Sequence, residues 1–314
     1  MSHLIPWVAF NAAVLAVLAI DLGLFNRKAH SVGVREAATW SAVWIALALA
    51  FAGWIFYSHG HHAGMEFIAG YLIEYSLSVD NIFVIVLIFS YFGIRDEYQH
   101  RVLFWGIIGA LLMRGAMIAI GATLIERFHW VTYVFGAFLL ITGARMLRHD
   151  EAQVDPERNP VVRLVRRVIP VCGDYHGQSF FVIDRDASGR LRRMATPLFI
   201  VLVVIETMDL VFAVDSIPAV FAVTRRPFIV YTSNVAAILG LRSLYFLLAG
   251  AVTKFRYLRY GLAIILAFVG VKMLAAVWYV IPTLASLGVI VSILAITAIA
   301  SVIAARRDPH TETA

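Results

Sequence analysis

An all-α membrane protein that crosses the bilayer several times is the fold class that this sequence predicts. Apolar residues make up 61% of the 314-residue chain and charged residues only 15%, whereas soluble domains have roughly 45–50% and about 25%. The apolar residues form continuous runs of the length that a helix needs to span a bilayer, about 20 residues. These runs lack the alternation of barrel strands. We therefore expect a bundle of transmembrane helices.

Nine apolar runs have the length of a span. They lie near residues 5–25, 38–57, 66–92, 102–125, 130–147, 196–224, 228–250, 257–278 and 280–304. The first run carries Asp21 and lacks both a basic leader and a small-residue cleavage motif, so we interpret it as a span and not as a signal peptide. The predicted order is spans 1–5 in residues 1–147, an insert in 148–195, spans 6–9 in 196–305 and a tail in 306–314.

The basic residues predict the orientation of these spans. Nineteen of the 26 Lys and Arg residues fall in alternate connections on one side of the membrane, and three fall on the other side. Because basic loops stay on the cytoplasmic side, we expect the N-terminus outside and the C-terminus in the cytoplasm. The net charge of +6 then reflects topology, and we expect no nucleic-acid partner.

The predicted cytoplasmic insert is the one sizeable polar segment. Residues 179–184 and 190–194 flank an Asp/Ser/Gly turn, which indicates a small β-hairpin. We expect a structural or regulatory insert and not an enzymatic domain. Cys172 is the single cysteine of the chain, which excludes an intrachain disulfide and a CxxC redox pair.

Two parts of the chain resemble each other more than shared hydrophobicity requires. Residues 78–82 (SVDNI) match 213–217 (AVDSI), and residues 143–147 (GARML) match 270–274 (GVKML), at offsets of 135 and 127. Spans 3–5 thus repeat as spans 6–8. Three crossings per unit make the repeat inverted, a common plan of secondary transporters. Chance similarity between apolar sequences is the alternative.

Charged side chains inside the spans are the candidate functional residues. The acidic ones are Asp21, Glu74, Asp80, Glu206, Asp209 and Asp215, and the basic ones are Arg114, Arg145, Arg242 and Lys272. An aspartate at mid-span costs about 2.5–3.5 kcal/mol, so these groups need partners. We expect Arg114 and Arg242 to be the internal partners, since the other two basic residues lie near helix ends. Structural ion pairing is one interpretation, but the surplus carboxylates favour shared protons or a bound cation. Asp21 lies near a span end and could simply be solvated.

A hard divalent cation suits the donors available. The predicted ligands are Glu74, Asp80, Asn81, Glu206, Asp209, Asp215 and Ser216. Their oxygen atoms favour Mg²⁺, Mn²⁺ or Ca²⁺ over Cu⁺ or Zn²⁺. We expect Pro218 to break its helix and so to bring Asp80, Asn81, Asp215 and Ser216 together where the repeats meet.

Other motifs are less favoured as sites. The histidines at 59, 61 and 62 could capture metal, although a solvated loop is the simpler reading. Cys172 close to His176 is thin support for a nucleophile. Nucleotide-binding, zinc-protease and nucleophile-elbow motifs are absent from the sequence. We expect neither enzymatic activity nor a permanently bound cofactor.

Two long segments resemble the signatures of the TerC/Alx family of integral membrane proteins. They are residues 70–81 (GYLIEYSLSVDN) and 206–219 (ETMDLVFAVDSIPA), and residues 195–198 (ATPL) also fit. The resemblance covers nearly the whole chain and implies nine spans, a central cytoplasmic insert and export of Mn²⁺. It also implies that the intramembrane acids Glu74, Asp80, Glu206, Asp209 and Asp215 carry the metal as a transported substrate.

The family also carries older labels, tellurite resistance and membrane-bound redox modulation. One cysteine and no cofactor motif give the redox label no support in these residues. The alternative to transport is a membrane scaffold or stress sensor whose insert recruits cytoplasmic partners.

Overall fold

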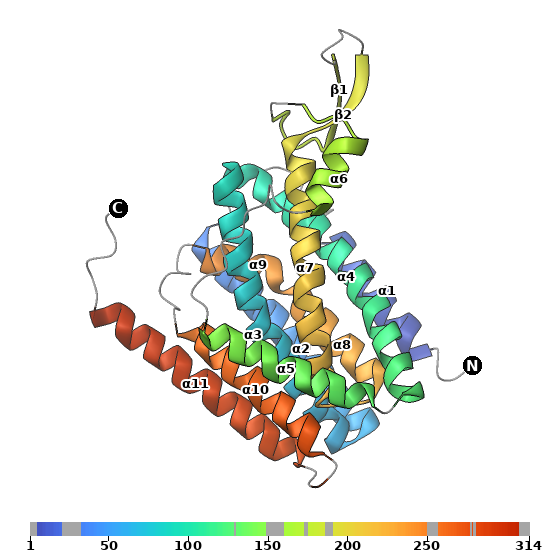
Figure 1. Cartoon of the computed structure of the whole chain (residues 1–314), viewed down its shortest axis with the longest axis vertical. Coiled ribbons are helices and arrows are strands. Elements are labelled where there is room, and N and C mark those ends of the chain that lie inside the picture. The colour runs from blue at the N-terminus through green and yellow to red at the C-terminus, as the bar shows by residue number, and fades with distance from the viewer. Residues whose placement is uncertain are drawn as a thin grey trace.

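The computed structural model describes residues 5–20, 33–128, 130–148, 160–172, 175–185, 191–249, 257–276, 278 and 281–307. This part of the chain is helical apart from one hairpin (Figure 1). The elements are α1 (Ile5–Ile20), α2 (Val34–His59), α3 (His61–Phe92), α4 (Asp96–Arg127), α5 (Val131–Arg148), α6 (Pro160–Val168), β1 (Phe181–Arg185), β2 (Leu191–Ala195), α7 (Pro197–Phe221), α8 (Pro227–Leu239), α9 (Leu241–Leu248), α10 (Leu258–Ala275) and α11 (Thr283–Arg307).

The protein is a multi-pass integral membrane protein. Among the described residues, five helices are long and apolar enough to cross a bilayer, namely α2, α3, α4, α7 and α11. The bent pair α8 and α9 adds a sixth span if it crosses as one unit. The apolar helices α1, α5 and α10 are shorter, so the expectation of nine spans stays a prediction.

Helix α3 lies at the centre of the bundle. It packs against α2, α7, α8 and α11, while α4 packs against α7 and α5 lies along α10 (Figure 1). Small residues allow α3 and α8 to pack closely. At Gly70 of α3, an added Cβ atom would lie only 2.8 Å from Ser233 Oγ of α8. This central position buries the polar residues that the predicted signature places on α3.

The expected helix break at Pro218 is wrong. Helix α7 runs without interruption from Pro197 to Phe221 and contains Pro218. A proline deprives only one carbonyl of its helical donor, and membrane helices tolerate that loss where neighbouring groups compensate. The break lies instead between α8 and α9, where the chain bends by 41° at Gly240.

The insert between α5 and α7 projects beyond one end of the bundle (Figure 1). Strands β1 and β2 pair antiparallel, with Phe181 opposite Ala195, where the sequence predicts a hairpin. The Tyr175 hydroxyl donates a 2.7 Å hydrogen bond to the Phe92 carbonyl at the end of α3. Burial raises the pKa of Tyr175, so this donor stays protonated. The insert is thereby anchored on the turn between α3 and α4.

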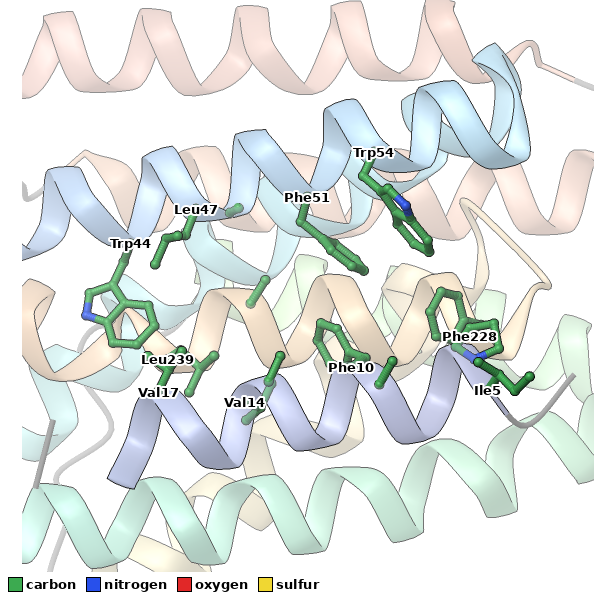
Figure 2. Close-up of a pocket in the computed structure, with 15 residues that line it drawn as sticks. Ile5, Phe10, Val14, Val17, Trp44, Leu47, Phe51, Trp54, Phe228 and Leu239 are labelled. Atoms are coloured by element: carbon green, nitrogen blue, oxygen red, sulfur yellow. The ribbon is translucent and has the colours of Figure 1, made fainter. Parts of the chain in front are cut away.

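An apolar crevice of about 430 Å³ separates α1 from α2 and α8 (Figure 2). Its labelled lining residues are Ile5, Phe10, Val14, Val17, Trp44, Leu47, Phe51, Trp54, Phe228 and Leu239. Aliphatic and aromatic side chains offer no ligands to an ion. The polar chemistry of the bundle therefore lies on the other side of α8, where it meets α3.

Candidate functional site: a buried carboxylate and arginine cluster

One arginine joins two of the predicted acids across three helices. Arg114 of α4 pairs with Glu74 of α3 through Nη1. Its Nη2 and Nε atoms donate to the two carboxylate oxygens of Asp209 on α7, at 2.8 and 3.2 Å. Arg114 is 2% exposed and Glu74 is fully buried. The rigid, planar guanidinium suits this two-pronged contact with a carboxylate.

Neutral donors and acceptors complete the surroundings of this ion-pair cluster. Asn234 of α8 donates from Nδ2 to Glu74 at 2.9 Å. Ser216 of α7 accepts a 3.3 Å hydrogen bond from Arg114. With both acids ionised, the two carboxylates and one guanidinium carry a net charge of −1. A buried negative charge of this kind is costly unless another cation or a proton joins it.

A small cavity lies directly beside the cluster. Its volume is about 30 Å³, and Asn81, Met208 and Asp209 are among the residues that line it. A volume of roughly 10–15 Å³ already holds one water molecule. The cavity is thus large enough for one water-sized occupant, and of its lining residues only Asn81 and Asp209 carry polar side chains.

Glu206 lies one helical turn before Asp209, on the α7 face toward α4. Its Oε2 atom is buried without a hydrogen-bond partner in the part of the chain that the structure describes. A Cβ atom at Gly109 of α4 would overlap the Glu206 carboxylate. Gly109 thus provides the space that the carboxylate occupies, and this carboxylate retains an oxygen with capacity to bind.

Asp215 and Ser216 face different helices. Asp215 accepts a 3.4 Å hydrogen bond from Thr142 of α5, whereas Ser216 contacts Arg114. The sequence predicted that a break in α7 would bring Asp215 and Ser216 together with Asp80 and Asn81. Because α7 stays helical here, Asp215 and Ser216 do not converge, and the side chain of Asp80 lies outside the described residues. Consecutive residues on a helix point about 100° apart.

Two predicted residues cannot be placed. Asp21 and the side chain of Asp80 lie outside the described residues. Arg242 lies in the first turn of α9, directly after the break at Gly240. Arg145 and Lys272 lie in the last turns of α5 and α10.

The described residues do not form an assembled metal centre. Among them, no three His, Cys, Asp or Glu side chains lie close enough together to hold a metal ion. Glu74 and Asp209 instead share the charge of Arg114. The arrangement is that of an ion-pair cluster with unsatisfied oxygen atoms beside it.

The weaker motifs are also placed. The Cys172 thiol is buried, with its Sγ 3.8 Å from His176 Nδ1. Of the histidine-rich turn, His62 lies 3.2 Å from Glu66, while the rings of His59 and His61 pack against aromatic neighbours.

Three residues of this region were not assigned a role at the site from the sequence. Asn234 and Gly109 contact predicted acids, and Glu66 is a buried acid near the start of α3. A polar residue in the middle of an apolar run could have revealed Asn234. Gly109 had no signal beyond its small size, and Glu66 was hidden by its position at a span end.

The comparisons with known proteins agree with the signatures. Residues 59–309 match the model of the integral membrane protein TerC family. The chain is 49% identical over 306 residues to an uncharacterized membrane protein of Myxococcus xanthus, covering 98% of this chain and 94% of the relative. It is 46% identical over 300 residues to an Escherichia coli K12 protein named "Putative membrane-bound redox modulator Alx", covering 93% and 92%. No solved structure matches the chain.

Proposed function

The chain belongs to the TerC family of integral membrane proteins, and from this premise we propose that it is a secondary transporter that exports Mn²⁺ from the cytoplasm. Glu74, Asp80, Glu206, Asp209 and Asp215 supply carboxylate ligands or accept protons along the way, and Asn81 and Ser216 supply neutral oxygens. We propose no permanently bound cofactor, no enzymatic activity and no nucleic-acid partner.

The observation that carries this proposal is the sharing of Arg114 between the buried carboxylate of Glu74 and the partly buried carboxylate of Asp209. The guanidinium group of Arg114 lies between Glu74 and Asp209 and forms an ion pair with each of them. A divalent cation that enters the adjacent cavity can bind Asp209 as Arg114 turns away. In the absence of metal, Arg114 neutralises the two carboxylates. During transport, the metal takes the place of Arg114.

Hard oxygen donors set the class of ion. The cavity beside Asp209 is also lined by Asn81, and carboxylate and amide oxygens suit Mn²⁺, Mg²⁺ and Ca²⁺. Among the described residues, the side chains that contact Arg114 are those of Glu74, Asp209 and Ser216, and none is a cysteine or histidine. This ligand set disfavours Zn²⁺ and Cu⁺.

The packing of α5 on α10 supports an inverted repeat. The offset of 127 equates Gly136 with Ala263 and Gly143 with Gly270. A Cβ atom at Gly143 would lie 2.6 Å from the Ala263 carbonyl oxygen, and one at Gly270 would lie 2.7 Å from the Gly136 carbonyl oxygen. Exchanging the repeats converts the first contact into the second. We infer a pseudo-two-fold axis between α5 and α10, as in transporters whose repeats alternate in conformation.

The same proposal covers membrane topology. We place the protein in the bacterial inner membrane with nine crossings, the N-terminus outside and the C-terminus inside. The insert contacts the α3–α4 turn through Tyr175 and Phe92. The insert and the α3–α4 turn, both of which are basic, therefore lie at the same end of the bundle. Their positive charge favours the cytoplasmic side.

Metal uptake into inverted vesicles tests this function. Vesicles that contain the chain should accumulate Mn²⁺ in preference to Mg²⁺, Ca²⁺ and Zn²⁺, and a pH gradient should change the rate if protons are exchanged. Asp80→Asn and Asp215→Asn should abolish accumulation. Wild-type uptake rates in both variants would remove these residues from the site.

A second function is favoured by the surface of the insert. Leu164, Ile183 and Leu191 are 60–75% exposed although they lie outside the spans, which fits a scaffold that binds a cytoplasmic protein. The variant Ile183→Ser with Leu191→Ser separates the alternatives. A scaffold should lose its cellular phenotype, whereas a transporter should retain Mn²⁺ flux.

A redox role would depend on the single thiol. Cys172 belongs to the insert and is buried, and Cys172→Ser removes the single thiol of the sequence. Unchanged activity of this variant would exclude thiol-based redox modulation.

A further inference from the structure

We propose that His62 and Glu66 form a second, weaker divalent-cation site at the outer end of α3, through which the transported ion leaves. The inference rests on the proposed function, because it extends the path of the same ion. Glu66 is buried although it lies in the second turn of α3. A buried carboxylate at a helix end needs a reason.

The two carboxylate oxygens of Glu66 contact different residues. Oε2 accepts a 2.9 Å hydrogen bond from the Thr224 hydroxyl and lies 3.8 Å from Arg226 Nε. Oε1 lies 3.2 Å from His62 Nδ1, one turn earlier on the same helix. One oxygen is thus fixed by the α7–α8 connection, and the other faces an imidazole.

The spacing between His62 and Glu66 suits a shared metal ion. Adjacent ligands of an octahedral ion lie about 3 Å apart when each is about 2.2 Å from the metal, a usual distance for such ions. The imidazole is 68% exposed at its side chain, so an ion can approach from outside. In the chain, His59 and His61 pack against aromatic rings and do not compete for this carboxylate in the described structure.

Polar residues connect this pair to the central cluster. Glu66 and Glu74 are eight residues apart on α3, about 12 Å along the helix. Between them Gly70 brings α3 against Ser233, and the next residue, Asn234, binds Glu74. Polar atoms therefore lie along the buried interface of α3 and α8, between the central carboxylates and the outer end of α3.

The surrounding charge makes the outer site weak. Arg226 lies 3.8 Å from Glu66, and Lys272 on α10 also interacts electrostatically with it. Positive neighbours lower the affinity for a cation, and an exit site must release its ion. The central cluster, with its net negative charge, is the tighter of the two.

Pulsed electron paramagnetic resonance on Mn²⁺ bound to the full chain tests the outer site. An imidazole nitrogen bound to Mn²⁺ modulates the spin echo, and the ligands proposed for the central site contain no imidazole. MnCl₂ added to the purified chain should give nitrogen modulation. His62→Gln and Glu66→Gln should each lose it, while His61→Gln, the matched control in the same turn, should retain it.

The outcomes separate this inference from the proposed function. Bound Mn²⁺ and measurable flux without nitrogen modulation would overturn the outer site alone. Retained modulation in His62→Gln, or its loss in His61→Gln, would also overturn it. Absence of both bound Mn²⁺ and flux would overturn the proposed function itself. Because His62 is exposed, its variant should fold, which gel filtration checks.

Discussion

At the scale of single residues, Arg114 determines the electrostatics of the buried cluster. It contacts Glu74, Asp209 and Ser216 from a position that is 2% exposed. Removing one partner of a buried ion pair leaves an uncompensated charge, which costs about 3–5 kcal/mol. Arg114 is therefore expected to be a structural residue of the empty site as well as a competitor of the metal.

Arg114→Gln should lower the free energy of unfolding by about 3–5 kcal/mol because Glu74 and Asp209 lose their cation. Adding Asp209→Asn should recover part of this loss, since one of the stranded charges disappears. Denaturation in detergent measures the four proteins of this double-mutant cycle. Strictly additive losses would contradict the pairing.

Gly109 is the residue on which the position of Glu206 depends. Gly109→Ala should displace the Glu206 carboxylate, because the new Cβ atom would occupy its space, and Mn²⁺ flux should fall sharply. Gly115→Ala is the matched control on α4, where a Cβ atom would make an ordinary 3.5 Å contact with Tyr231. Equal flux in the two variants would show that Glu206 does not act in transport.

The acids of the site could be predicted from sequence because charge inside an apolar run is costly and therefore conspicuous. Their pairing could not. Arg114 was expected to be an internal partner, but its choice of Glu74 and Asp209 depends on how α3, α4 and α7 pack. The role of Gly109 has the same origin, since a missing side chain carries no chemical signal.

At the scale of elements, the sequence predicted the helices better than their irregularities. Each predicted apolar run contains a helix, although only five or six of these helices are candidate spans, and the Asp/Ser/Gly turn located the hairpin. The break was assigned to Pro218, whereas the structure bends at Gly240 between α8 and α9. A proline signal is local, but whether a helix bends depends on what its neighbours allow. The short helix α6 of the insert was missed.

The α5–α10 interface should be sensitive to single methyl groups. Gly143→Ala and Gly270→Ala would each place a Cβ atom within 3 Å of the opposing backbone, so each should cost about 1–3 kcal/mol by overpacking. Gly288→Ala on α11 is the control, because nothing lies within 4 Å of its added Cβ. Thermal unfolding of the three variants measures the difference.

Similar losses for Gly143→Ala and Gly270→Ala would agree with the proposed two-fold relation between the repeats. A large loss in one variant with none in the other would contradict the symmetry of this interface.

At the scale of the whole molecule, the family is the firmest result. The two signatures led to TerC/Alx from the sequence, and the match over residues 59–309 confirms that membership. The substrate is not contained in the fold, because a fold specifies where a site lies and not which ion uses it. The proposed transport of Mn²⁺ therefore has to be tested on the acids themselves.

The most direct measurement is Mn²⁺ uptake by the purified chain in liposomes, compared between wild type, Asp209→Asn and Glu126→Gln. Asp209 holds Arg114 and lines the central cavity, whereas Glu126 is exposed near the end of α4. We predict saturable uptake by wild type and Glu126→Gln, and none by Asp209→Asn. Uptake by Asp209→Asn at the wild-type rate, or no uptake by the wild-type chain, would contradict the account.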